Sequence, residues 1–182
     1  MDKHSRRDVF RIAAAAAVAA VPGTAQETAP KFFTPAEFRM VDELSEIIIP
    51  ADDHSPGARA AKVAAYIDQT LAESLDDKPR EEFREGLAAV DQLSNKLNHV
   101  SFLDASPEQR VAVVAQMARA EKDPKKPEEL FFVRLKGRTA QAYYTSEIGI
   151  HQEIGYKGNV LLNEFVGFDA SLAPIPLPES SK

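Results

Sequence analysis

The hydrophobic residues of this chain recur every three or four positions over long stretches, which is the spacing of one face of an α-helix. The first stretch opens with Thr34-Pro35-Ala36-Glu37, where threonine can cap, proline suits the first turn and glutamate can close a capping box. This helix must end at Ile49, because Pro50 disfavours helical geometry in the residue before it. Similar patterns predict helices over residues 58–74 and 79–98, from 107 onward, and from 127 to near Gly149. The side chains expected to face inward are Phe38, Val41, Leu44 and Ile48; Val63, Tyr66, Ile67 and Leu71; Phe83, Leu87, Val90 and Leu97; Val111, Val114, Ala115 and Ala118; and Phe131, Leu135, Ala142 and Tyr143.

No stretch alternates with a period of two for long enough to predict a strand. We therefore expect an all-α fold, a small irregular bundle of about five helices with a glycine- and aromatic-rich C-terminal segment. The helical domain should cover residues 34–172. A proline-rich tail, expected to be extended, covers residues 173–182, where prolines occupy alternate positions from 174 to 178.

The first 25 residues have the order of a signal peptide. The pair Arg6-Arg7 stands before an alanine-rich apolar run, and Gly23-Thr24-Ala25 follows as a small-x-small site. The pair resembles a twin-arginine export signal, so Arg6 and Arg7 are candidates for recognition by the twin-arginine translocase, with cleavage after Ala25. The mature chain would then begin with a linker over residues 26–33 and reside in the periplasm. The alternative is a basic arm beside an alanine-rich helix.

The composition of the chain excludes several kinds of functional site. The 182 residues include no cysteine, which excludes disulfides, thiolate metal sites and a cysteine nucleophile. The net charge of −6 argues against a nucleic-acid partner, which requires a basic face. The chain contains no glycine-rich phosphate loop and no serine in a nucleophile-elbow context. We therefore predict no catalytic, cofactor-binding or metal-binding residue in this chain.

Two polar groupings could hold a metal or a small ligand. Asp52, Asp53 and His54 lie together in a turn and could hold a metal or small ligand, although aspartates in such a turn more often bond nearby backbone amides. Glu147 and His151 are four residues apart, so a helix could place both on one face. Such pairs are common surface contacts on helices.

The stretch from Tyr143 to Phe168 combines three of the four tyrosines with four of the eight glycines. Glycines are placed where the backbone turns or approaches something closely, and aromatic side chains supply area for a core or a partner. The stretch is either a lid over the protein's own core or a docking surface. The side chains expected at a partner interface are Tyr144, Tyr156, Leu161, Phe165 and Phe168.

Several short motifs, taken in order, resemble the gluconate 2-dehydrogenase subunit 3 family. The first group is Ile47-Ile48-Ile49-Pro50-Ala51-Asp52-Asp53, then Pro56-Gly57-Ala58 and Val63-Ala64-Ala65-Tyr66-Ile67-Asp68. The second group is Tyr144-Thr145-Ser146-Glu147-Ile148-Gly149, then Gly155-Tyr156-Lys157-Gly158-Asn159, then Glu164-Phe165 and Gly167. Each motif is short, and their order along the chain makes the resemblance specific.

The resemblance implies a role as the non-catalytic small, or gamma, subunit of a periplasmic sugar or sugar-acid dehydrogenase. In such complexes a large flavoprotein of the glucose–methanol–choline type holds FAD, and a cytochrome c subunit with haem c can take the electrons. The small subunit assists maturation and carries the leaderless flavoprotein through the twin-arginine route; partners can hold the complex at the inner membrane. Related complexes oxidise gluconate, glucose or the 3-hydroxyl of glycosides, as glucoside 3-dehydrogenases do. The alternative is a free-standing periplasmic helical binding protein with a small ligand or metal.

Overall fold

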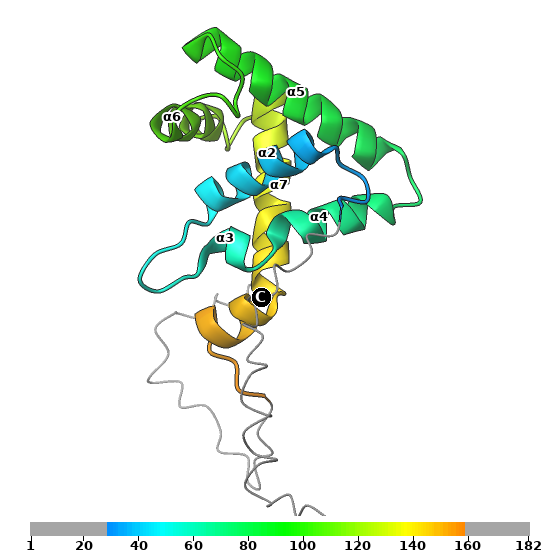
Figure 1. Ribbon diagram of the computed structural model, residues 1–182, viewed down its shortest axis with the longest axis vertical. Coiled ribbons are helices and arrows are strands. Elements are labelled where there is room, and N and C mark those ends of the chain that lie inside the picture. The colour runs from blue at the N-terminus through cyan, green and yellow to red at the C-terminus, as the bar shows by residue number, and fades with distance from the viewer. Residues whose placement is uncertain (1–28, 159–182) are drawn as a thin grey trace, which may run out of the picture.

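The computed structural model describes residues 29–158, which form helices joined by turns and contain no strand (Figure 1). This confirms the expected all-α fold within the described part of the chain. Five of its helices are longer than two turns, as the sequence predicts. The elements in chain order are α2 (Pro35–Ile48), α3 (Gly57–Ala60), α4 (Val63–Ala72), α5 (Lys78–Asn98), α6 (Pro107–Ala118), α7 (Pro127–Tyr144) and the short π-helix η1 (Gly149–Glu153).

Two of the helix starts are closed by capping boxes. In α2 the Glu37 N–H donates to Thr34 Oγ1 at 3.2 Å, and the Thr34 N–H donates to Glu37 Oε2 at 2.8 Å. In α6 Ser106 and Gln109 make the same reciprocal pair, at 3.3 and 2.8 Å. Each box satisfies amides that have no partner inside the helix, so local sequence alone sets where these helices begin.

Helix α7 is the element around which the bundle is built. In Figure 1 it runs vertically while α5, α2 and α4 cross it one below another. Aromatic rings connect these helices: the Phe83 ring lies 5.8 Å from that of Phe33 and 5.2 Å from that of Phe131 on α7. Gly86 lets α5 come close, because a Cβ there would meet the Phe131 ring at 2.0 Å. The largest fully buried side chains are Tyr143, Phe83, Phe102, Phe131, Leu44, Ile67, Leu71, Met117 and Leu135.

Several predicted inward faces were wrong in detail. Tyr66 is 42% exposed, Leu97 47% and Val111 51%. In α6 the buried side chains are Val113, Val114 and Met117, whereas Ala115 is exposed and Ala118 is only partly buried. The predicted set of four and the observed set of three both fit helical spacing, and the orientation of α6 against α5 and α7 selects the second. Phe38 and Ile48 are also only partly buried at the edge of the core.

The helix predicted over residues 58–74 is divided into α3 and α4. Lys62 adopts a left-handed conformation with φ 56°, which ends α3 and redirects the chain into α4. Lysine carries none of the usual break signals, so helical periodicity alone missed this turn.

The final part of the segment expected as a linker lies against the bundle. The buried carboxylate of Asp68 accepts the amide N–H groups of Lys31, Phe32 and Phe33 at 2.6, 3.0 and 2.8 Å. Phe33 is 4% exposed and belongs to the core. Asp68 therefore anchors the approach to α2.

Candidate docking surface at one end of the bundle

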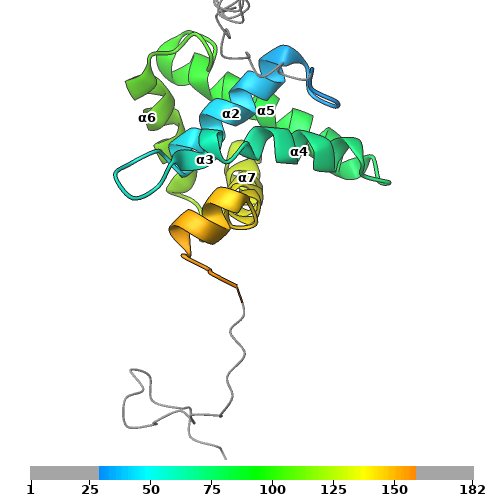
Figure 2. The same cartoon turned by 60° about the horizontal axis from the view of Figure 1, so that its bottom comes forward.

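The loop between α2 and α3 is held in one shape by polar side chains. Glu46 near the end of α2 accepts the Ala51 N–H at 3.1 Å and the Arg59 N–H at 2.8 Å. Gly57 has φ +82°, and a Cβ on it would lie 2.7 Å from the Ala51 nitrogen. Only glycine tolerates both this backbone conformation and this close approach. The loop therefore has a defined shape, and Figure 2 shows its backbone on the same side of the bundle as η1.

Tyr143 joins this loop to the C-terminal end of α7. Its side chain is fully buried, and its hydroxyl lies 2.6 Å from Ser55 Oγ in the loop. The same hydroxyl donates to Glu153 Oε2 in η1 at 3.4 Å, so the Ser55 hydroxyl acts as the donor to Tyr143. One phenol therefore connects segments that are 88 residues apart in the sequence.

The chain reverses sharply after α7. The Ser146 hydroxyl donates to the Tyr143 carbonyl at 2.6 Å and accepts the Gly149 N–H at 3.0 Å. A Cβ on Gly149 would lie 2.0 Å from the Tyr143 carbonyl oxygen, so only glycine allows this approach without movement of the backbone. Helix α7 therefore ends at Tyr144, five residues before the end that the sequence predicts, and η1 folds against its last turn.

The segment after η1 is held back toward it. The Tyr156 N–H donates to the Ile150 carbonyl at 3.0 Å, and His151 Nδ1 lies 3.0 Å from the Tyr156 carbonyl oxygen. The apolar side chains at this end remain accessible: Tyr144 is 45% exposed, Ile154 60% and Tyr156 46%. We call these three side chains the end patch. Its position is set by the Ser55–Tyr143–Glu153 connection and by the Ser146 turn.

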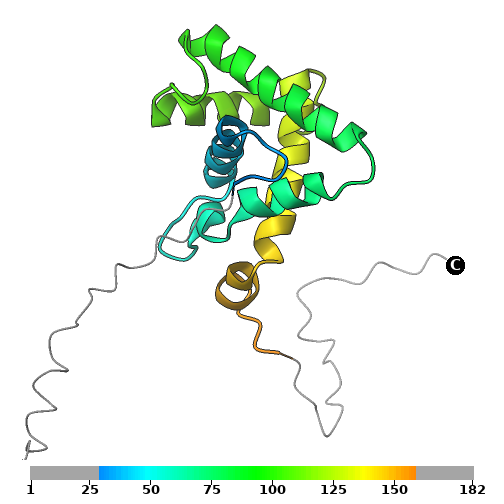
Figure 3. The same cartoon turned by 45° about the vertical axis from the view of Figure 1, so that its right-hand side comes forward.

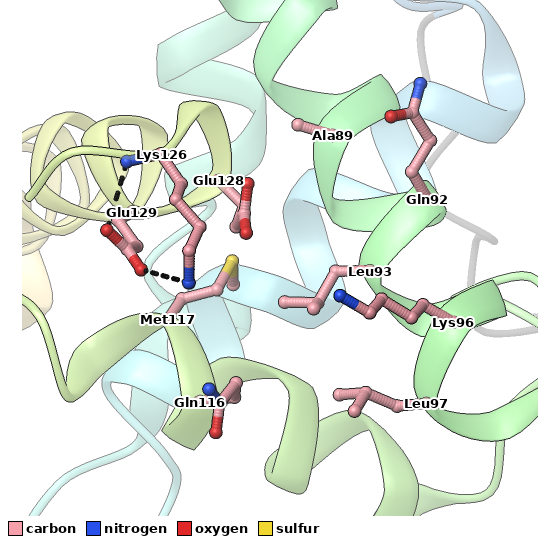
Figure 4. A pocket seen from close by; sticks show the side chains of 10 residues that line it. All are labelled: Ala89, Gln92, Leu93, Lys96, Leu97, Gln116, Met117, Lys126, Glu128 and Glu129. Carbon is pink, nitrogen blue, oxygen red and sulfur yellow. Dashed lines mark hydrogen bonds and ion pairs between the residues drawn. The ribbon is translucent and has the colours of Figure 1, made fainter.

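A separate hollow of about 250 Å³ lies between α5, α6 and the start of α7. In Figure 4, Leu93 and Met117 face each other across it, with polar side chains around them. Glu129 at its edge accepts the Lys125 and Lys126 amide N–H groups, both at 3.0 Å. These amides and the Lys126 ammonium lower the pKa of Glu129 to about 2. The hollow lies at the opposite end of α7 from the end patch, about 25 Å away along the helix.

Comparison with known families decides the identity of the chain. The family model described as gluconate 2-dehydrogenase subunit 3 matches residues 35–160, which is more than half of the sequence. The chain belongs to the gluconate 2-dehydrogenase subunit 3 family. No curated protein and no solved structure matches it. Membership of this family gives the chain a subunit role in a multi-subunit dehydrogenase.

The segments that carry the two groups of motifs are joined at this end of the bundle, because Ser55 in the first segment and Glu153 in the second both bond to Tyr143. The first group contains the α2–α3 loop, and the second contains Tyr144, Ser146, Gly149 and Tyr156. Figure 3 shows the loop and η1 next to each other below α4. Sequence reasoning treated the motifs separately and assigned Tyr143 to the core, which is correct. It missed the second role of the Tyr143 hydroxyl, because a phenol pairing with Ser55 and Glu153 leaves no local pattern.

The polar groupings in the sequence have structural partners. Asp52 Oδ1 accepts the His54 and Ser55 N–H groups at 2.8 and 2.7 Å, the side-chain turn that the sequence favours. These amides, His54 first, lower the pKa of Asp52. His151 contacts Tyr156, as described above, and no bond joins it to Glu147. Within residues 29–158, no three potential metal ligands of the His, Asp and Glu type cluster together.

Of the side chains expected at a partner interface, Tyr144 and Tyr156 lie in the end patch. Leu161, Phe165 and Phe168 lie outside the described residues, as do Arg6, Arg7 and Ala25 of the leader. Ile154, the most exposed member of the patch, was not singled out from the sequence. Among the helices that the structure describes, none combines the length and apolar character needed to cross a membrane.

Proposed function

We propose that this chain is the non-catalytic small subunit of an exported FAD-dependent sugar or sugar-acid dehydrogenase, and that the end patch docks the flavoprotein subunit. The observation that carries the proposal is that Tyr143 bonds the α2–α3 loop through Ser55 and η1 through Glu153, at the same end of the bundle as three exposed apolar side chains. FAD belongs to the flavoprotein partner, of the glucose–methanol–choline type, and haem c to a cytochrome c subunit.

The chemistry of the end patch supports docking over a role as a core lid. Tyr144 and Tyr156 each expose nearly half of their surface, although Tyr143 beside them is fully buried. Tyrosine is enriched at interface hot spots because it combines a large apolar area with a hydroxyl. The patch is also held by hydrogen bonds, so little ordering is required when a partner binds.

The leader supports the second part of the proposal, which is export. A twin-arginine signal carries folded proteins, so a leader on this subunit can serve a partner already bound in the cytoplasm. The Asp68 anchor begins at Lys31, only a few residues after the expected cleavage site at Ala25. Only a few residues would therefore separate the signal from the folded bundle. A periplasmic location of the complex is part of the proposal and rests on the leader sequence.

The alternative, a free-standing binding protein with a ligand at the Asp52–His54 turn, has no observation in its favour. One oxygen of Asp52 already accepts two backbone amides. In the proposed dehydrogenase subunit, the α2–α3 loop that contains Asp52 supports the end patch.

The proposal is tested by binding of the mature chain to the FAD-containing dehydrogenase subunit from the same source. Tyr156→Ala should keep the helical circular dichroism spectrum and weaken the complex about 30-fold, the equivalent of about 2 kcal/mol for a hot spot. Tyr66→Ala is the matched control, because Tyr66 on α4 is exposed to a similar extent, 42% against 46%. Its affinity should equal that of the wild type.

Three results would contradict this proposal. Absence of wild-type binding to the flavoprotein, or stoichiometric FAD on the isolated chain, would reject the subunit role. A Tyr156→Ala variant that melts at a much lower temperature, and whose folded fraction binds normally, would identify the tyrosine as part of a core lid.

A further inference from the structure

Helix α7 has one side that no other described element covers. Leu130, Val133, Gly137 and Tyr144 occupy this side, because their spacing of three, four and seven residues returns to nearly the same angle on a helix. Leu130 is 49% exposed, Val133 39% and Tyr144 45%. Figure 2 shows α2, α4 and α5 on the other side of α7. We call these four residues the outer face.

Charged side chains next to the outer face are paired away from it. Arg134 Nη2 lies 3.1 Å from Glu82 Oε2 on α5, and Lys136 Nζ lies 2.7 Å from Glu121 Oε1 in the loop before α7. These two pairs lie on opposite sides of the outer face. An apolar centre with a charged rim is the usual anatomy of a protein interface.

Among the described residues, no close contact requires a glycine at position 137, in the middle of this face. Glycine in a helix interior is unfavourable compared with alanine. At Gly86 and Gly149 a Cβ would meet neighbouring atoms at 2.0 Å, so glycine is needed at both. At Gly137 a Cβ would meet no atom of residues 29–158 within 4 Å. A small residue on an exposed helix face allows another backbone to approach closely. Such an approach would explain why glycine stands at position 137.

The size of the end patch also indicates a larger interface. A stable complex buries about 800 Å² on each partner. Three side chains that are about half exposed can offer on the order of 300 Å². The outer face continues from the patch through Tyr144, which belongs to both, and extends about 20 Å along α7 to Leu130.

We propose that a helix of the flavoprotein subunit packs along the outer face of α7 and makes its closest backbone approach at Gly137. This inference rests on the proposed function and extends its docking surface from the end patch to the length of α7. Packed helices lie 8–10 Å apart depending on the side chains between them, and a glycine at the crossing point permits the short end of that range.

The test uses two substitutions at Gly137. Gly137→Ala should raise the melting temperature of the isolated subunit by about 2–4 °C, through helix propensity alone. Gly137→Leu, in open space, should leave the isolated subunit folded and weaken the flavoprotein complex by about tenfold or more. Gly137→Ala should weaken it by less. Ala88→Leu, at an exposed position of α5, is the control and should bind as the wild type.

These variants distinguish a failure of the outer-face proposal from a failure of the proposed function. If Gly137→Leu binds normally while Tyr156→Ala is weakened, the outer face is not part of the interface, and the end patch remains one. If the wild-type chain does not bind the flavoprotein at all, both proposals fail.

A single thiol identifies what covers the outer face. The chain has no cysteine, so Val133→Cys in the full chain introduces a unique probe. Its alkylation should be fast in the isolated subunit and roughly tenfold slower in the flavoprotein complex. Leu75→Cys, at a fully exposed position, should react equally in both. Slow alkylation in the isolated subunit would overturn the inference: if independent of concentration it would assign the face to the chain's own terminal residues, and if concentration-dependent to a second copy.

Discussion

At the residue scale, the hydroxyl of Tyr143 connects segments that are far apart in the sequence. Its ring is part of the core, and its oxygen connects the α2–α3 loop with η1. A buried hydroxyl must find a partner, and this one has two in segments that are distant in the sequence. The end patch therefore depends on an atom that a docking partner would not touch.

Tyr143→Phe should lower the free energy of unfolding by about 1 kcal/mol, because it removes the hydroxyl and keeps the ring. Ser55→Ala should cost a similar amount. The double variant should cost less than the sum of the two, since both remove one bond. Denaturant unfolding of the four proteins measures this coupling, with the exposed Tyr66→Phe as a control. Additive effects would show that the Ser55–Tyr143 bond contributes nothing to stability.

At the element scale, carboxylates that accept backbone N–H groups fix where α2 and α7 begin. Asp68 on α4 accepts hydrogen bonds from three backbone amides before α2. Glu129 accepts two from the amides at the start of α7. Amide N–H groups before a helix and in its first turn have no acceptor within the helix. A carboxylate that accepts them therefore fixes the position of that segment. These two acids set where the first helix and the central helix enter the bundle.

Removal of the Asp68 carboxylate should release the segment before α2. Asp68→Ala leaves three amides without their acceptor, so we expect a loss of about 3 kcal/mol in the free energy of unfolding. Hydrogen exchange at the Phe33 amide should accelerate more than exchange in α7. Asp53→Ala, an exposed carboxylate in the α2–α3 loop, should change stability by less than about 0.5 kcal/mol. Unchanged exchange at Phe33 in Asp68→Ala would contradict this role.

Glu129 makes stability depend on pH in the acid range. Its pKa is about 2 in the folded chain and about 4.3 in an unfolded one. The unfolded state therefore binds the proton first as the pH falls, and the stabilisation present above pH ~4.5 is lost progressively toward pH ~2. The melting temperature of Glu129→Gln should fall less over this window than that of the wild type. Glu128→Gln removes the same charge one residue away and should retain the wild-type slope.

At the scale of the whole molecule, the ends of α7 have different surroundings. The start of α7 adjoins the hollow with α5 and α6, and its end adjoins the loop and η1 that form the support of the end patch. The order of the elements brings the two motif groups to the same end of the bundle. This end of the bundle is the docking surface that we propose for the flavoprotein subunit.

Export is the prediction that belongs to this scale. Arg6→Lys together with Arg7→Lys should leave the precursor in the cytoplasm, and the flavoprotein should be retained with it if this subunit carries it across. Fractionation with antibodies to both chains measures this. A substitution in the bundle such as Tyr66→Ala should export normally. Undiminished periplasmic protein from the double variant would exclude the twin-arginine route.

The sequence by itself determined the fold class and the starts of several helices. Caps and prolines at residues 34–35, 106–107 and 127 place the starts of three helices, because these interactions join residues only a few positions apart. The period of the apolar residues determined the fold class for the same local reason. The order of the motifs also indicated the family, which the family comparison confirmed.

Tertiary structure decided which face of each helix is buried and where α7 ends. Val111 and Val113 both fit an apolar face of α6, and packing against α5 and α7 buries only the second. The early end of α7 depends on η1 folding back onto the Tyr143 carbonyl, and the end patch depends on Ser55, which is 88 residues away. Periodicity defines a face along one helix, whereas contacts between distant segments determine which face is buried and which side chains remain exposed.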